Sequence, residues 1–132
     1  MVLIDSSVWI QFYNHKQATP ELDQVLSMGQ AATTDLIMTE VLQGFRLAEK
    51  KRYAIALSDM ECCIYLQSFN KKIAIASAQN YRKLRNKGIT PRNTIDVYLA
   101  TICLEYNAYL LTYDQTDFKP MSQVLGLKLL AV

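Results

Sequence analysis

Four carboxylates in this sequence stand where a metal site could be built. Asp5 and Asp114 each follow a short apolar segment typical of a buried strand, whereas Glu40 and Asp96 fall in the first halves of two expected helices. Sites in open parallel sheets form in the crevice beyond the carboxyl ends of the strands, so the four side chains are expected to converge there. Ligation by oxygen alone selects a hard divalent ion, Mg²⁺ or Mn²⁺.

Three of these acids, and Asp117 beside them, also have purely structural interpretations. Asp96 would be the second residue of a helix capped by Thr94, where the helix dipole favours a negative charge. Asp114 and Asp117 lie in a turn, and either of them could cap a short helix that follows. Asp5 precedes two serines and could be a turn residue. Taken singly, none of these positions establishes a site.

Glu40 is harder to explain as a structural residue. Its helical neighbours four and three residues before it and four after it are Leu36, Ile37 and Gly44, so it projects from a mainly apolar face. A buried carboxylate without a partner costs several kcal/mol or becomes protonated unless a cation neutralises it. A metal ion is the natural cation for this position.

Signals for other cofactors are missing from the sequence. The single histidine, His15, and the three cysteines Cys62, Cys63 and Cys103 do not have the spacing of a familiar zinc site. The chain also contains no GxGxxG, P-loop or GxSxG motif. The oxygen-ligated ion is therefore the only cofactor that the sequence predicts.

Length and composition predict one globular domain over residues 1–132. The chain is 51% hydrophobic and 20% charged, and its net charge of +2 does not by itself predict a polyanionic partner. The odd number of cysteines fits a reducing compartment, so a cytoplasmic location is expected. No apolar run approaches the roughly 18 residues of a membrane span.

Basic residues are concentrated in one part of the chain. Between residues 62 and 95 there is no Asp or Glu, yet this stretch carries seven of the 14 Lys and Arg residues. On a helical projection Lys72, Lys83 and Lys87 form one stripe, and Arg92 follows in the next loop towards Asp96. The stripe is either a solvated helix face or a surface that contacts RNA phosphates.

The elements that must position these residues alternate between strands and helices. Strands are expected at 2–4, 31–34 and 108–112, a turn or short strand at 63–66, and a weaker strand at 127–132. Helices are expected at 7–14, 20–29, 35–47, 51–60, 69–87 and 94–107, from apolar spacing and from capping residues. This order predicts an α/β three-layer sandwich, with helices on both sides of a mostly parallel central sheet.

Four segments, taken in order, resemble the motif series of PIN-domain ribonucleases. They are DSSVWI at 5–10, TEVLQG at 39–44, TIDVYLA at 94–100 and LLTYDQTDF at 110–118. The chain length and the KGITP segment at 87–91 resemble the VapC toxins of bacterial toxin-antitoxin pairs. The resemblance covers essentially the whole chain.

The resemblance assigns roles by position. It implies that Asp5, Glu40, Asp96 and Asp114 form an acidic quartet, with Asp117 as a variable fifth acid that in some relatives carries the charge in place of Asp114. Hydroxyl positions that support the quartet would be Ser7 and Thr112. Two residues depart from the pattern, because Tyr113 stands where many relatives have a basic residue and Tyr98 replaces a small aliphatic one.

The resemblance also implies an activity and partners. It implies a Mg²⁺- or Mn²⁺-dependent endoribonuclease toxin that cleaves structured RNA, such as tRNA or ribosomal RNA, leaving a 5′-phosphate and a 3′-hydroxyl. A VapB-type antitoxin and a second copy of the chain, in a homodimer, are the expected protein partners. The residues leave two other hypotheses open: a receiver-like regulatory module that binds Mg²⁺ without catalysis, and a degenerate PIN-like scaffold that only binds RNA.

Overall fold

The computed structural model describes residues 1–14 and 17–132, so His15 lies outside the described residues. Its sheet, as far as the chain is described, has four parallel strands in the order β3-β2-β1-β4. The strands are β1 (Val2–Ile4), β2 (Ala31–Thr34), β3 (Ile64–Leu66) and β4 (Tyr109–Leu111). Leu3 lies in the central strand, with Ala32 and Leu110 as its neighbours on either side. The carboxyl ends of the four strands therefore all lie at the same end of the sheet, which we call its carboxyl edge.

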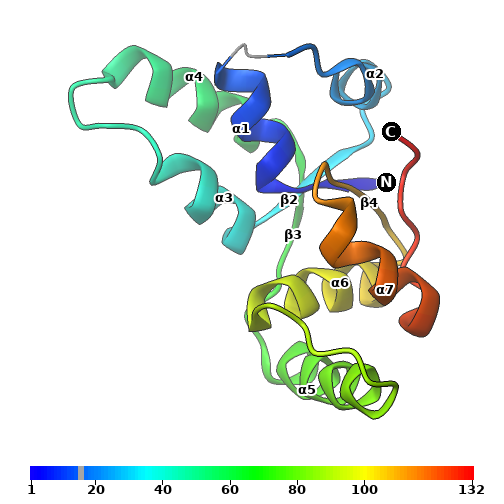
Figure 1. Cartoon of the computed structure of the whole chain (residues 1–132). Helices are drawn as coiled ribbons and strands as arrows, with labels where there is room; N and C mark the ends of the chain where they lie inside the picture. The colour runs from blue at the N-terminus through cyan, green and yellow to red at the C-terminus, as the bar shows by residue number, and fades with distance from the viewer. Residues whose placement is uncertain (15–16) are drawn as a thin grey trace.

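Helices cover both faces of the sheet, as expected. Figure 1 shows α1 to α4 on one side of the strands and α5, α6 and α7 on the other. The helices are α1 (Ser6–Asn14), α2 (Pro20–Ser27), α3 (Asp35–Leu42), α4 (Lys50–Glu61), α5 (Lys71–Asn86), α6 (Thr94–Tyr106) and α7 (Gln115–Leu125). The predicted three-layer α/β sandwich with a parallel sheet is confirmed.

The core forms where the apolar strands meet the inner faces of the helices. Leu3, Ile4, Leu110 and Leu111 are fully buried, and Trp9 packs into the same cluster from α1. Burial of each such side chain contributes about 1.5–3 kcal/mol. The core therefore holds the ends of β1 and β4 rigidly, and these ends carry the acids.

Several predicted boundaries were wrong. The helix expected to reach residue 47 ends at Leu42. Asn93, and not Thr94, caps α6, because its Oδ1 accepts a hydrogen bond of 2.9 Å from the backbone N–H of Asp96. Asp96 is therefore the third residue of its helix. The helix expected from residue 69 begins at Lys71, after the cap Asn70.

Two further differences lie near the C-terminus. The short helix expected at Phe118 is α7, which begins at Gln115 and therefore includes Asp117. It continues to Leu125 and is capped by Gly126, whose φ of +79° is left-handed. The strand expected at 127–132 is reduced to one bridge between Leu110 and Leu129. No helix of the described residues is long and apolar enough to span a membrane.

Candidate active site

Asp5 is the most buried of the predicted acids. Its backbone N–H donates to the carbonyl of Leu111 over 2.9 Å, which joins the ends of β1 and β4. Its side chain is 6% exposed, and Oδ2 accepts hydrogen bonds of 2.8 Å from both Ser7 Oγ and Thr112 Oγ1. Both hydroxyls that the resemblance singled out therefore lie against Asp5.

The same two hydroxyls hold the loop that follows β4. Thr112 Oγ1 accepts a bond of 3.0 Å from the N–H of Asp114, and Ser7 Oγ accepts one of 3.2 Å from the N–H of Tyr113. Ser7 and Thr112 are also 3.4 Å apart. The position of Asp114 is thus tied to that of Asp5 through a short hydrogen-bonded network.

Three of the predicted acids form a cluster at the start of two helices. Carboxylate oxygens of Asp96, Asp114 and Asp117 lie within 4.8 Å of one another, and all three residues are half-buried. Asp96 is in the first turn of α6, while Asp114 precedes α7 and Asp117 lies in its first turn. The structure therefore brings together acids that were predicted from two separate segments.

Glu40 completes the acidic group from the opposite side, on α3. Its Oε2 is 3.5 Å from Ser6 Oγ, whereas its Oε1 is buried and has no hydrogen-bond partner among the described residues. Burial raises the pKa of Glu40, and the nearby charges of Asp5 and Asp96 raise it further. Glu40 is therefore half-buried, with two other acids near it rather than apolar side chains alone.

Burial and mutual repulsion raise the pKa values of acids in this group. Burial, followed by the charges of Asp5, Asp117 and Asp114, raises the pKa of Asp96 to about 6. The pKa of Asp114 is also raised, first by burial and then by Asp117. Within residues 1–14 and 17–132, the basic side chain in contact with these acids is that of Arg92, which is exposed and has Nη1 3.7 Å from Asp117 Oδ2. The all-oxygen donors and the unpartnered Glu40 Oε1 fit a hard divalent ion.

This repulsion predicts a pH-dependent stability for the metal-free protein. The folded pKa of Asp96 lies above its usual value of 3.8, so the folded state binds more protons than the unfolded state between about pH 4 and pH 6, and stability falls as the pH rises through that range. Asp96→Asn should therefore stabilise the metal-free protein at neutral pH, by about 1 kcal/mol once solvent screening of this half-exposed group is allowed for. Urea unfolding with a chelator at both ends of the range measures the effect. A variant with equal or lower stability at neutral pH would contradict it.

The basic residues predicted as one stripe lie at different positions along α5, with Lys72 in its first turn and Lys83 and Lys87 at its end. Lys72 pairs with Glu105 over 3.4 Å near the C-terminal end of α6, whereas Asp96 is in the first turn of that helix. Lys83 and Lys87 are exposed near the end of α5, and within the described residues neither pairs with an acid. Lys72 therefore lies away from the acids, and the other two lie at the end of α5 that leads to α6.

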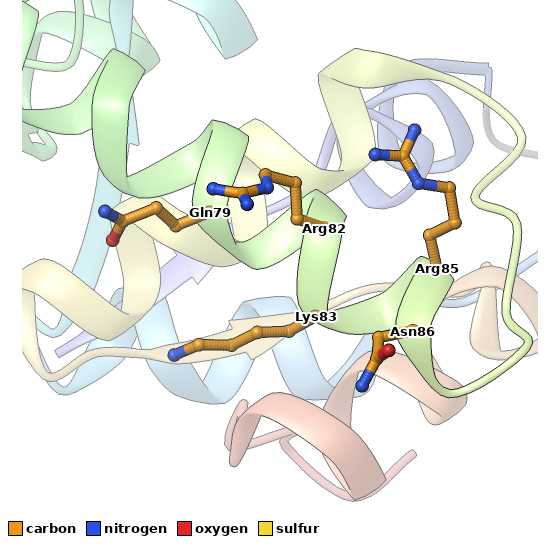
Figure 2. A pocket seen from close by; sticks show the side chains of 5 residues that line it. All are labelled: Gln79, Arg82, Lys83, Arg85 and Asn86. Carbon is orange, nitrogen blue, oxygen red and sulfur yellow. The ribbon is translucent and has the colours of Figure 1, made fainter.

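Two arginines that the sequence analysis did not single out extend this basic surface. Arg82 and Arg85 line a surface hollow of about 670 Å³ on α5, together with Gln79, Lys83 and Asn86. Figure 2 shows Arg82 and Arg85 extending on one side of the helix, and Lys83 and Asn86 on the other. Both arginines lie in the stretch without Asp or Glu, and this position could have identified them as candidate RNA contacts. The helical projection instead pointed to Lys72, Lys83 and Lys87.

Both tyrosines that depart from the PIN pattern have specific partners. The hydroxyl of Tyr113 donates to Glu21 Oε2 on α2 over 2.9 Å. The hydroxyl of Tyr98 donates to the backbone carbonyl of Ser68 over 2.7 Å, which ties α6 to the loop after β3. Each tyrosine therefore joins an element that carries acids to a neighbouring segment.

An apolar hollow lies next to Glu40. It has a volume of about 160 Å³ and is lined by residues of α1, of α3 and of the segment after α3, including Ile10, Tyr13, Val41 and Phe45. Arg52 of α4 and Glu40 itself also line it. A buried carboxylate at the edge of an apolar hollow suits a partner side chain that has an aliphatic stem and a cationic end.

Comparison with protein families matches residues 2–122 to the PIN domain. No curated protein sequence matches the chain significantly. Among solved structures, DNA-bound VapBC from Salmonella typhimurium is similar, with a TM-score of 0.79, 18% identity and coverage of 98% of this chain and 96% of that one. VapBC2 from Rickettsia felis, bound to a promoter DNA fragment, has a TM-score of 0.77 and 17% identity, with coverage of 98% of this chain and 98% of that one. FitAcB from Neisseria gonorrhoeae has a TM-score of 0.72 and 16% identity, with coverage of 99% of this chain and 97% of that one. At these identities the structural likeness establishes the fold.

Proposed function

Because this chain belongs to the PIN domain family, we propose that it is a metal-dependent endoribonuclease that acts as the toxin of a toxin-antitoxin pair. One observation carries the proposal: acids from four separate segments meet at the carboxyl edge of the sheet, and the buried Oε1 of Glu40 has no partner among the described residues. Membership of the PIN family argues against the hypothesis of a receiver-like regulatory module. The full set of acids argues against a degenerate scaffold.

Asp5, Asp96 and Asp114 would hold Mg²⁺ or Mn²⁺, with Glu40 and Asp117 beside them. When bound, the ion makes a water more acidic and compensates the charge that develops on the phosphate. Asp5 is fixed through Oδ2 by two hydroxyls, which leaves Oδ1 available as a ligand atom. The raised pKa of Glu40 suits a carboxylate that accepts a proton from the attacking water at Oε1.

Phosphodiester hydrolysis by a water nucleophile accounts for the products that the PIN resemblance implies. Attack on phosphorus with loss of the 3′-oxygen leaves a 5′-phosphate on one fragment and a 3′-hydroxyl on the other. This chemistry does not use the ribose 2′-hydroxyl as nucleophile. Blocking the 2′-hydroxyl at the cleaved position therefore should not prevent cleavage, provided that the RNA still binds.

The proposed biological role follows the structural neighbours, which include VapBC and FitAB complexes. An antitoxin of VapB type would place an apolar segment in the hollow beside Glu40 and a Lys or Arg next to that carboxylate. A homodimer and a cytoplasmic location belong to the same proposal. Structured RNA, such as tRNA or ribosomal RNA, is the proposed substrate class.

The decisive experiment incubates purified chain with total RNA in a chelator and then in Mg²⁺ or Mn²⁺. Cleavage that appears only with the metal, with 5′-phosphate ends, supports the proposal. RNA binding without cleavage at any metal concentration would instead identify a degenerate scaffold. For the toxin role, expression of the chain should arrest growth, and co-expression of a cognate antitoxin should restore it.

The basic end of α5 gives a separate prediction about RNA binding. Exposed Lys83 and Lys87 are expected to contact phosphates, and each lost contact lowers the slope of log affinity against log salt by about 0.7. Lys83→Ala/Lys87→Ala should therefore weaken RNA binding and flatten this slope, with unchanged stability. Binding isotherms at several salt concentrations, with Ca²⁺ in place of Mg²⁺, measure the change.

A matched control removes the same charge elsewhere. Lys50 and Lys51 are exposed at the start of α4, on the other side of the sheet. Their double replacement by Ala should leave the slope unchanged. If both double variants have the same slope of log affinity against log salt, then Lys83 and Lys87 do not contact RNA and only form a solvated helix face.

A further inference from the structure

Another surface hollow lies between α5 and α6, on the far side of α6 from the acids. Its volume is about 480 Å³, and its lining is mainly apolar. Small side chains of α5, such as Ala74 and Ser77, form part of the lining, and Tyr81 and Tyr98 contribute rings from the two helices. A hollow between two aromatic side chains suits a flat, largely apolar ligand.

Tyr98 is held in place before any ligand arrives. Its hydroxyl donates to the carbonyl of Ser68 over 2.7 Å. Ser68 is fully buried, and its hydroxyl bonds to both Thr34 and Asp35 at the start of α3. The ring of Phe69, tilted by 41° and centred 6.1 Å away, packs against that of Tyr98. A side chain fixed in this way loses little conformational entropy when a ligand packs on it.

The lining of the hollow also includes a positive charge. Arg82 lines it, and the Arg85 guanidinium lies 5.8 Å from the centre of the Tyr81 ring. Figure 2 shows Arg82 and Arg85 extending on the same side of α5. Aromatic rings beside arginine guanidiniums are the groups that bind single-stranded nucleic acids, by stacking on bases and by attracting phosphates.

The hollow and the acids flank the same turn of α6. Thr94 and Tyr98 line the hollow, whereas Asp96 lies between them in sequence. Residues two apart on a helix point to nearly opposite sides, which a helix of about 10–12 Å diameter separates. A short RNA segment that crosses the exposed N-terminal end of α6 would therefore reach both places.

We propose that this hollow, which we name the α5–α6 pocket, binds one unpaired nucleobase of the RNA next to the cleaved phosphodiester. The inference rests on the proposed nuclease function and adds a recognition element to it. RNA is favoured over a second copy of the chain because Arg82 lines the pocket, Arg85 lies beside the Tyr81 ring, and no acidic residue lies between 62 and 95. Stacking accepts any base, so the pocket selects unpaired nucleotides rather than a sequence.

The test is a double-mutant cycle in which a tyrosine ring of the protein and a base of the RNA are removed separately and then together. The protein carries Asp96→Asn throughout, so that RNA is bound without cleavage. Affinities are measured for a single-stranded oligonucleotide and for versions made abasic at each position in turn. Tyr81→Leu and Tyr98→Leu remove the rings, while Tyr81→Phe and Tyr98→Phe keep them. Tyr109→Leu changes an exposed tyrosine of β4 as a matched control.

Loss of either ring should lower affinity for the intact oligonucleotide by about 5- to 150-fold, as expected for one stacked base. One abasic position should cause a similar loss in the parent protein and no further loss in the Leu variants. Tyr81→Phe and Tyr109→Leu should bind like the parent, whereas Tyr98→Phe keeps the ring but loses the bond to Ser68 and should bind with an affinity between those of the parent and Tyr98→Leu. If Tyr98→Leu fails to fold, Tyr81→Leu provides the same comparison.

Three other results would contradict the proposal, and each can be told apart from the expected result. Additive losses, or losses equal to that of Tyr109→Leu, would overturn the pocket. A change of molar mass in the Leu variants, without any change in base dependence, would show that the pocket is a contact between copies and would also overturn it. If the parent chain without Asp96→Asn cleaves no RNA under any metal condition, the nuclease proposal fails first.

Discussion

Asp96→Asn is expected to lower RNA cleavage by more than about 100-fold while leaving the fold intact. Replacement of groups that merely support a metal ligand typically costs 10- to 100-fold in affinity or activity, so loss of a charged ligand should cost more. The carboxamide has the same shape but cannot supply the negative charge that a hard divalent ion requires. Initial rates of cleavage at saturating Mg²⁺, with circular dichroism of both proteins, provide the measurement.

Glu105→Gln is the matched control for this prediction. Glu105 lies on the same helix, is exposed and pairs with Lys72 over 3.4 Å, so its replacement changes the charge by the same amount outside the acidic group. This control should cleave RNA at the wild-type rate. Mg²⁺ should also raise the melting temperature of wild type and of Glu105→Gln but not that of Asp96→Asn, because an ion that binds the folded state stabilises it. Wild-type activity in Asp96→Asn would refute the assignment of the acids.

The positions of the acids were predictable because they follow from local patterns. Asp5 directly follows the apolar strand β1, and Asp114 lies three residues after Leu111, where the apolar strand β4 ends. The two strands pair in parallel, so their carboxyl ends lie side by side. Glu40 was identified by its apolar helical neighbours. These signals lie within a few residues of each acid, so no knowledge of long-range packing was needed.

The wrong boundaries had longer-range causes. The helix expected to reach residue 47 ends at Leu42, yet Phe45 keeps the apolar spacing because its ring packs on Tyr13 of α1, 5.8 Å away, from outside the helix. At the C-terminus, Leu130 N–H donates to the Leu110 carbonyl over 2.9 Å, but the pairing with β4 ends after one bridge. Apolar periodicity reports burial, and a buried loop or tail satisfies it as well as a helix or strand.

The roles of Tyr98, Arg82 and Arg85 could not be predicted, since each depends on contacts between elements far apart in sequence. The sequence marked Tyr98 only as a departure from the PIN pattern. Its bond to Ser68 requires the loop after β3 to pass beside α6, and that arrangement is visible only in three dimensions. The helical projection of α5 also could not show which of its basic residues α6 leaves accessible.

Thr112→Val is expected to raise the Mg²⁺ concentration for half-maximal cleavage by about 10- to 100-fold, with much of the activity restored at saturating metal. Thr112 is fully buried, donates to Asp5 Oδ2 over 2.8 Å and accepts from the N–H of Asp114 over 3.0 Å. Valine fills the same volume but removes both bonds. Asp5 would lose one of the two hydroxyls that orient it, and Asp114 would lose the acceptor that fixes its backbone. Titration of cleavage rate with Mg²⁺ measures the shift.

Thr33→Val separates this positioning effect from a general cost of losing a buried hydroxyl. Thr33 is 1% exposed on β2, and its Oγ1 has no hydrogen-bond partner among the described residues. Its replacement should leave the Mg²⁺ dependence unchanged and should not lower the free energy of unfolding. Thr112→Val should lower that free energy by about 1–3 kcal/mol, because the N–H of Asp114 is left unsatisfied. If Thr112→Val loses stability but keeps the wild-type Mg²⁺ dependence, then Thr112 supports the fold alone, and Asp5 is oriented well enough by Ser7.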